Sequence, residues 1–595
     1  MAEFRKSVPS YRYNPGLESL HGTSAARRNT FGFENDGPVT KGQNLKKKSV
    51  GIGFDFVGLM FITQMVMKWV HTMTATGESF MFMGYHVPAP TMQIYTAVTS
   101  LPGTLKPLLG LISDAFPIMG YTKSPYCLLI SIPGLLGMWA CGFSPAHPMG
   151  GGLSAFFSMG GDVKPTFSIA LIVTCIFFCH LMLAMSEVFT SGVLAEKVNE
   201  MMDGQDDSTA QGAENKAKTF NLIGIFVVLG MAAGIGAHFV CGTVLTNQGA
   251  PMLYLIGAAM ATLLPLWVMF RGFGEPKLTP EQLVKVRKFL RGQTEVVGLT
   301  ILLSLATLFM IFVPMAGGNG TLLNFIVAIG TSLVIITAFV VQLTPVVARM
   351  LFCFFIFNAC NFNLSAAMQY FCVDNKYQLP GGPNFSKMFV TFWLPLVGTF
   401  AGLFGCMVFK FVGTTYGLRQ WEIITTLLMA PTLCLQVIWV YRLNLKWGIQ
   451  DEVWVMIESG CFGFFMALQS MPYTFAIPRM CPVGLESSMM QLLGGCVFMG
   501  GIVAEDIGAL ILQMADITPS GAFFEQDKFK NLAPIVTLKC VVAFVCTLAV
   551  LPLMPSSPMT DKLIQNERPD AATNGSLWKR WMQKRSSGKE ASATS

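Results

Sequence analysis

Residues 106–126 read KPLLGLISDAFPIMGYTKSPY and join two long apolar segments. Gly110 and Pro117 disfavour helix here, because glycine is conformationally loose and proline lacks an N–H donor. Asp114 places a charge beside apolar sequence. The stretch therefore predicts a polar loop between two membrane-spanning helices, at a membrane surface. This loop is either an ordinary connection between two helices or an element with a role in function.

The composition of the whole chain supports a membrane protein. Of the 595 residues, 52% are hydrophobic and 12% are charged, whereas soluble domains carry about 25% charged residues. A helix needs about 20 apolar residues to cross the hydrocarbon layer. Apolar runs of this kind are expected near 52–72, 90–112, 125–143, 166–189, 219–241, 251–270, 296–315, 322–342, 346–370, 387–411, 419–441, 452–474, 486–513 and 533–554.

The distribution of charge orients these spans. With both termini in the cytosol, most lysines and arginines fall in the tails and inner loops, as cytoplasmic loops require. Between the sixth and seventh spans, Thr279 and Gln282 have the spacing of a capping box ahead of a basic amphipathic helix. The predicted divisions are a disordered tail (1–50), a six-helix bundle (51–271), an amphipathic cytosolic linker (272–295), an extra helix pair (296–342), a second six-helix bundle (343–555) and a cytosolic tail (556–595).

Three motifs resemble those of folate-biopterin transporters, which belong to the major facilitator superfamily. The first is KPLxGLxSDxxPIxGY within residues 106–121, and the second is SEVFTSGVLAEKV, in which Ser191 stands where the family usually has a second acid. The third is CPxGxE at residues 481–486. The resemblance implies an all-α polytopic membrane protein with two six-helix bundles that rock about a central site. The extra helix pair is similar to that of trypanosomatid-type members and gives about 14 spans, with 12 as the alternative.

Ionisable residues within spans are functional candidates, because each costs roughly 2.5–3.5 kcal/mol to insert. Adjacent residues on a helix point about 100° apart, so Glu505 and Asp506 cannot both face one partner closely. A pterin offers parallel donors to a carboxylate and a flat ring for stacking, and a folate tail requires cations. The candidates for substrate binding or proton coupling are Asp55, Glu187, Glu505, Asp506, Lys68, Lys106 and Trp393. Considered beside them are Glu458, Lys539 and the span aromatic residues Phe54, Phe56, Trp69, Phe357, Phe362 and Tyr370.

A second group of residues is expected to act in gating. In the superfamily, the loop that corresponds to the one with Asp114 keeps the inner side closed through polar contacts with the opposite half. The resemblance implies Arg479 or the N-terminus of the eleventh span as its partner here. Glu196 belongs to the second motif, and Glu486 lies where a helix N-terminus favours negative charge. The simpler interpretations are a connecting loop for Asp114 and a helix cap for Glu486.

The functional prediction is a secondary active transporter that imports folate, pteridines such as biopterin, or both, by alternating access and coupled to protons. S-adenosylmethionine or another small metabolite is the alternative cargo, and a channel or receptor is the alternative class. An enzyme is disfavoured because the six histidines show no HExxH or other paired spacing. No cofactor, metal site or nucleic-acid partner is predicted. Membrane lipid surrounds the protein, and the plasma membrane is the default location.

Overall fold

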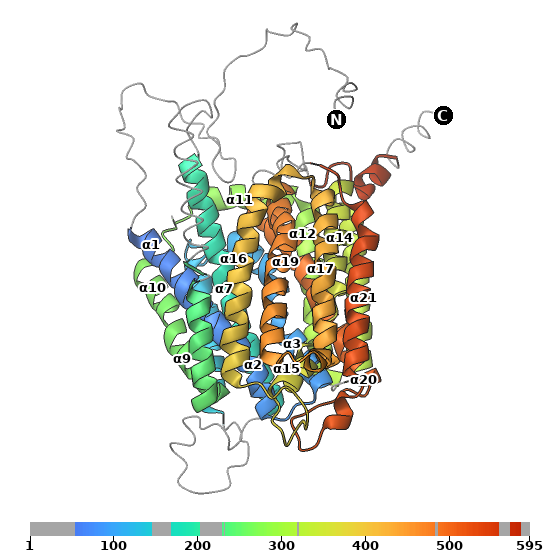
Figure 1. The fold of residues 1–595 in the computed structure, drawn as a ribbon. Helices are drawn as coiled ribbons and strands as arrows, with labels where there is room; N and C mark the ends of the chain where they lie inside the picture. The colour runs from blue at the N-terminus through green and yellow to red at the C-terminus, as the bar shows by residue number, and fades with distance from the viewer. Residues whose placement is uncertain are drawn as a thin grey trace, which may run out of the picture.

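The computed structural model describes residues 54–144, 168–202, 229–230, 232–275, 277–317, 320–481, 486–557 and 572–584, which are almost entirely helical. Ten helices in this part are long and apolar enough to cross a membrane. They lie side by side in one bundle (Figure 1). A polytopic all-α membrane protein, as predicted from the sequence, is therefore confirmed.

The ten spans match ten of the predicted apolar runs. They are α5 (Ser124–Phe143), α7 (Ile169–Met202), α9 with α10 (Ala250–Ala261 and Leu263–Arg271), α12 (Thr294–Gly317), α13 (Thr321–Gln342), η2 with α16 (Phe389–Trp393 and Leu394–Val412), α17 (Leu418–Val440), α19 (Asp451–Arg479), α20 (Glu486–Met514), and η4 with α21 (Gln526–Phe529 and Leu532–Val550).

The other four predicted runs differ in form. The second consists of α3 (Ala89–Ser100) and α4 (Pro102–Ala115), and the ninth of α14 (Pro345–Ala359) and α15 (Ser365–Val373). The fifth includes helical residues 232–247, and its earlier part lies largely outside the described residues. The first is α1, η1 and α2 (Phe54–Phe61, Ile62–Val66 and Met67–Gly84). It continues beyond the predicted end at residue 72, because the polar face around Thr74 and Glu78 is buried against other helices.

The segment 106–126 contains more helix than its glycines and prolines suggest. Helix α4 continues through Pro107 and Gly110 to Ala115, so the expectation of a break at Gly110 is wrong. Pro107 is buried and packs against the glycine face of α20 at Gly495, and this packing overrides helix propensity. The turn follows only at residues 116–123, where Gly120 has a φ of 87°.

Glu275 holds this turn to the start of α5. Its carboxylate accepts backbone hydrogen bonds from Thr122, Lys123 and Ser124 at 2.9, 2.9 and 2.7 Å, and hydroxyl hydrogen bonds from Thr122 and Ser124. Burial would raise the pKa of Glu275, but these hydrogen bonds outweigh it and hold the pKa below its ordinary value. No pattern in the sequence indicated this contact.

Helix α20 lies at the centre of the molecule, between helices from both parts of the chain. Of its apolar membrane-spanning stretch, 67% is buried, a larger share than in any other of the ten spans. It packs against α3 and α4 on one side and against α13 and α14 on the other. Helices α16 and α19 also approach each other closely, and a Cβ on Gly463 would clash with the Gly398 carbonyl oxygen. Small residues let helix backbones meet in this way within membranes.

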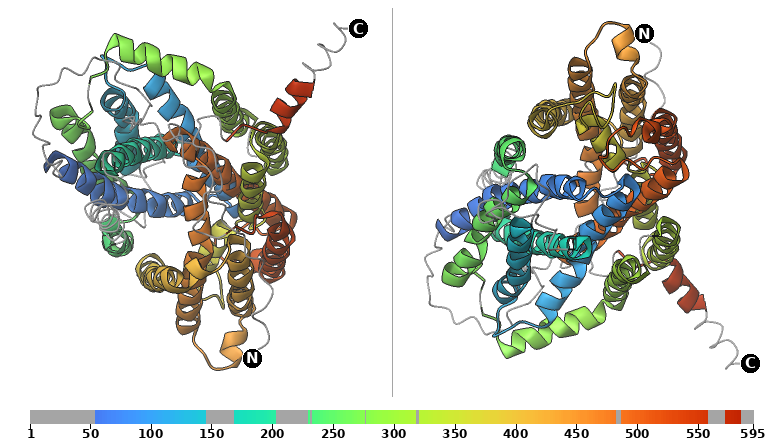
Figure 2. Two further views of the ribbon diagram at one scale, coloured as in Figure 1. Left: turned by 90° about the horizontal axis from the view of Figure 1, so that it is seen from above. Right: turned by 90° about the horizontal axis from the view of Figure 1, so that it is seen from below.

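The helix α11 (Pro280–Gly292) begins with the capping box predicted for Thr279 and Gln282. It lies across one end of the molecule (Figure 2). Arg287 donates from Nε to the Ala115 carbonyl oxygen at 3.1 Å and lies over the Phe116 ring. Helix α12 contacts α4 through the hydroxyls of Thr104 and Thr307, 2.8 Å apart. Helix α13 (Thr321–Gln342) packs against α20 and α14 in turn.

Candidate functional site

A cavity of about 630 Å³ lies among α14, α17, α19, α20 and α21, and Ser100 of α3 reaches its wall. Its lining combines charge, amides and aromatic rings. The charged residues are Glu422, Glu458, Glu505 and Lys539, the amides are Asn358, Asn361, Gln436 and Gln469, and the aromatic residues are Phe354, Phe357, Phe462, Tyr473, Phe498 and Phe544. The volume is within the roughly 300–1,000 Å³ of small-molecule sites.

Glu505 connects this cavity to the first group of helices. Its carboxylate accepts a hydrogen bond from Asn363 Nδ2 at 2.6 Å and another from the Gln93 amide of α3. Gln93 also accepts from the Ala366 backbone N–H at 3.2 Å, so α3 is joined both to α20 and to the start of α15. Glu505 therefore lines the cavity and its carboxylate also holds α3 to α20.

The neighbouring Asp506 points elsewhere. It is buried and lines a small void with Asn324 of α13 and Pro314 of α12, away from the larger cavity. This divergence follows from the angle of about 100° between successive helical residues. Of the adjacent predicted pair, only Glu505 lines the cavity.

Glu422 is a cavity residue that the sequence reasoning missed. Its side chain is 1% exposed in α17, and its Oε2 has no hydrogen-bond partner among the described residues. The residue lies near the beginning of the span, beside Arg419, where a carboxylate is usually interfacial. The Arg419 guanidinium instead donates to the Met554 carbonyl oxygen. A buried carboxylate oxygen without a partner, in a residue that lines a cavity, is suited to accept donors from a ligand.

Lys539 is the cation of the cavity. It lines the same wall space as the carboxylates of Glu458 and Glu505. Phe354 and Tyr473 meet edge to face with ring centroids 4.8 Å apart. Such a pair can present one aromatic wall to a flat, polar ligand in the cavity.

Other predicted site residues lie away from this cavity. Lys106 Nζ lies 2.7 Å from Glu187 Oε2, so these two candidates form an ion pair between α4 and α7. Lys68 is exposed on α2. Trp393 is 46% exposed in η2 and does not line the cavity. Asp114 lies in the last turn of α4. The side chains of Asp55, Glu196, Arg479 and Glu486 lie outside the described part of the chain.

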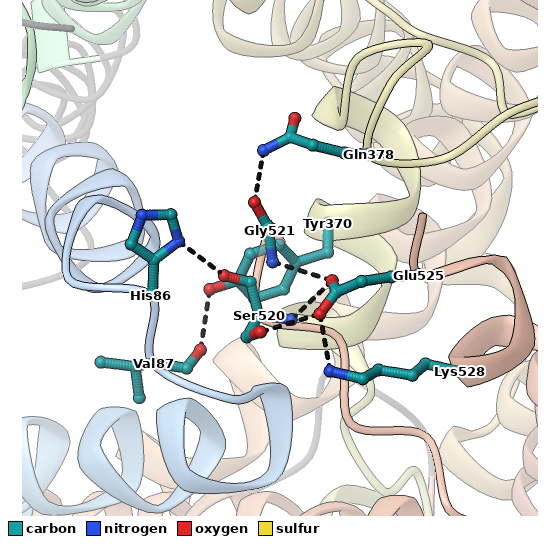
Figure 3. Close-up of polar contacts among 8 residues, drawn as sticks. All are labelled: His86, Val87, Tyr370, Gln378, Ser520, Gly521, Glu525 and Lys528. Atoms are coloured by element: carbon teal, nitrogen blue, oxygen red, sulfur yellow. Dashed lines mark hydrogen bonds and ion pairs between the residues drawn. The ribbon is translucent and has the colours of Figure 1, made fainter. Parts of the chain in front are cut away.

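A set of contacts closes the end of the molecule that holds α15 (Figure 3). His86 Nδ1 lies 3.0 Å from the Ser520 carbonyl oxygen, and the Tyr370 hydroxyl donates to the Val87 carbonyl at 2.7 Å. The Ala89 backbone N–H donates to the Pro519 carbonyl at 2.9 Å. These bonds join the α2–α3 turn to α15 and to the loop between α20 and α21. We call them the α15-end closure.

Glu525 organises the loop in this closure. It accepts from the backbone N–H groups of Ser520 and Gly521, each at 2.9 Å, and from Lys528 Nζ at 2.6 Å. Burial raises the pKa of Glu525, but the bonds from Lys528 and Ser520 outweigh burial and lower it. Asp374 is also buried beside it. Burial, and then the charge of Glu525, raise the pKa of Asp374 to about 7.

Most of the chain matches a known protein family. The sequence model of the BT1 family matches residues 69–572. "Probable folate-biopterin transporter 2" of Arabidopsis thaliana is 25% identical over 192 residues, which is 32% of this chain and 36% of the relative. "Folate-biopterin transporter" of Synechocystis is 25% identical over 176 residues, which is 29% of this chain and 33% of the relative. The matched segments thus span about a third of these relatives.

Solved structures share the fold at low identity. The crystal structure of a POT family transporter in complex with 5-aminolevulinic acid has a TM-score of 0.52 at 13% identity, covering 85% of this chain and 96% of that chain. The crystal structure of a D-xylose-proton symporter has a TM-score of 0.52 at 9% identity, covering 85% of this chain and 99% of that chain. This likeness shows a fold of the major facilitator type.

Proposed function

The chain belongs to the BT1 family of folate-biopterin transporters, and we propose that it imports folate, pteridines such as biopterin, or both, as a secondary active transporter. The observation that carries the proposal is the cavity, in which three carboxylates, one lysine and several aromatic rings surround about 630 Å³. Membership of a transporter family removes the alternative of a membrane enzyme.

Glu422 is proposed to bind the pterin edge. The 2-amino group and the neighbouring ring N–H of a pterin are parallel donors, and a carboxylate accepts such a pair through both oxygens. Glu422 Oε2 has no partner among the described residues, so this pairing breaks no bond that the structure describes for it. The aromatic walls near Phe354 and Tyr473 then contact the ring faces. Lys539 provides the cation for the carboxylates of a folate tail.

Alternating access is proposed to operate around this cavity. The α15-end closure joins the two groups of helices at one end, and α11 marks the opposite end, which we assign to the cytosol because cytoplasmic segments retain basic residues. Opening then requires the contacts of His86, Val87 and Ala89 to break. Substrate shifts the equilibrium only by as much as it binds one state better than the other. We place the protein in the plasma membrane with both termini inside the cell.

The charge of the cavity also supports an alternative substrate. Three carboxylates face a single lysine, which favours a cation over an anion. S-adenosylmethionine carries a sulfonium and an amino group, and it is therefore the alternative substrate. A channel or receptor is the alternative class, and neither accumulates a solute against its gradient.

Uptake in cells that lack pteridine transport tests this proposal. Labelled folate, biopterin and S-adenosylmethionine are supplied in acidic and in neutral medium, with surface expression measured in parallel. We expect uphill uptake of at least one pteridine, stronger in acid, and a higher KM in Glu422→Gln. Glu295→Gln, which removes a carboxylate paired with Lys579 outside the cavity, is the matched control. Preference for S-adenosylmethionine alone, or no uptake of any ligand by protein at the surface, refutes the pteridine assignment.

A further inference from the structure

A second set of titratable residues lies among the first helices, outside the cavity. Glu78 of α2 is 4% exposed, although a charged group so deeply buried is costly without partners. Its Oε2 lies 2.9 Å from His180 Nε2 of α7, and its Oε1 accepts from the Thr99 hydroxyl of α3. The carboxylate is thus held by three helices that carry none of the cavity's charged residues.

This pair connects to an exposed surface of the same helices. The His71 ring meets the His180 ring edge to face, with centroids 6.4 Å apart. His71 is exposed, and the charges near it include those of Lys68, Lys106 and Glu187. The side chain of Glu187 is 67% exposed. Exposed His71 therefore lies against half-buried His180, which in turn contacts buried Glu78.

The surroundings of Glu78 offer few competing charges. The titratable groups that face it from other packed helices are Cys141 of α5, Cys179 of α7, Tyr254 of α9 and Glu505 of α20. The cysteines and the tyrosine are ordinarily neutral at physiological pH. Glu505 is the remaining carboxylate of this set, so its charge and that of Glu78 repel each other.

Helix α3 links the two carboxylates mechanically as well. Its Thr99 donates to Glu78, and its Gln93 donates to Glu505 on the other group of helices. The same helix begins at Ala89, whose N–H belongs to the α15-end closure. A change of charge at Glu78 is therefore applied directly to the helix that holds both the cavity carboxylate and the closure.

We propose that Glu78 and His180 form a proton-binding site, reached past His71 and separate from the substrate cavity. This rests on the transport function proposed above. One proton taken from water adds to the pair, no covalent bond between heavy atoms forms or breaks, and the pair changes from negative to neutral. Loss of that negative charge relieves the repulsion on Glu505, so proton binding and binding of a ligand by Glu505 are coupled.

The first test needs no substrate. Full-length protein in nanodiscs is titrated with acid while carboxyl absorption is recorded by infrared difference spectroscopy. We expect one titrating carboxyl band to disappear in Glu78→Gln and to shift in His180→Gln, while Glu422→Gln keeps it. His180→Gln serves as the second variant if Glu78→Gln fails to fold. An unchanged set of bands in both variants overturns the proton site, whatever the protein transports.

The second test separates coupling from transport. Proteoliposomes are assayed with labelled folate or biopterin, both for accumulation driven by a proton gradient and for counterflow exchange at equal pH. We expect Glu78→Gln and His180→Gln to lose gradient-driven accumulation and keep counterflow, because exchange needs no net proton movement. Gradient-driven accumulation equal to wild type overturns the site. Failure of wild type in both assays refutes the proposed function instead, and the infrared result alone then decides the proton site.

Discussion

Replacing Glu525 by glutamine is expected to loosen the α15-end closure. The carboxylate accepts hydrogen bonds from Ser520, Gly521 and Lys528, and both oxygens are used. The glutamine amide replaces one carboxylate oxygen with an NH₂ group, which cannot accept the hydrogen bonds that this oxygen receives in Glu525. Hydrogen bonds to charged groups contribute about 1.5–3 kcal/mol each, and Lys528 is 40% exposed, which reduces its share. We expect a net cost of about 2 kcal/mol, or roughly thirtyfold in the ratio of closed to open molecules.

Electron–electron distance measurements test this expectation. Spin labels are introduced through an unnatural amino acid at Gly84 and Phe523, which lie on the two sides of the closure and leave the native cysteines unlabelled. Glu525→Gln should move population from the short to the long distance, and Asp527→Asn, an exposed carboxylate in the same loop, should not. A distance distribution in Glu525→Gln that matches wild type would show that this loop does not hold the closure.

Three further substitutions test other parts of the structure. Burial raises the pKa of Asp374 from 3.8 to about 7, so the closed state loses stability as pH rises through that interval, by up to about 4 kcal/mol. Asp374→Asn should abolish this pH dependence in the same distance measurement, and a retained dependence would contradict it. Glu275→Gln should cost about 2 kcal/mol and lower the melting temperature, whereas an unchanged value would remove its stabilising role. Gly463→Ala should cost roughly 1–3 kcal/mol by forcing α16 from α19, and equal melting of this variant and Gly330→Ala, which meets open space, would refute the close packing.

The long apolar runs were predictable because membrane insertion imposes length and composition on each helix separately. The capping box at Thr279 was also predictable, because its two partners are only three residues apart in the sequence. The first span shows the limit of this reasoning. Polar residues between Thr72 and Ser79 look like the end of a span, but α3, α7 and α9 cover them and α2 continues to Gly84.

Contacts between distant segments could not be predicted. Glu275 and Ser124 are 151 residues apart, and His86 and Ser520 are 434 apart. Nothing in one sequence specifies which loops meet. Glu78 lies beyond the predicted end of the first span, so the sequence pattern does not indicate a buried carboxylate there. The gating prediction concerned Asp114 at the inner end, whereas the α15-end closure lies at the other end of the molecule.

Uphill transport by the purified protein tests the central claim most directly. The full chain is reconstituted into liposomes with an inward proton gradient, and internal folate and biopterin are measured with and without a protonophore. The proposal predicts that at least one of them accumulates above its outside concentration and that the protonophore abolishes this accumulation. Equilibration without accumulation would indicate a channel, and exclusion of both ligands by correctly folded protein would contradict a folate or pteridine transporter.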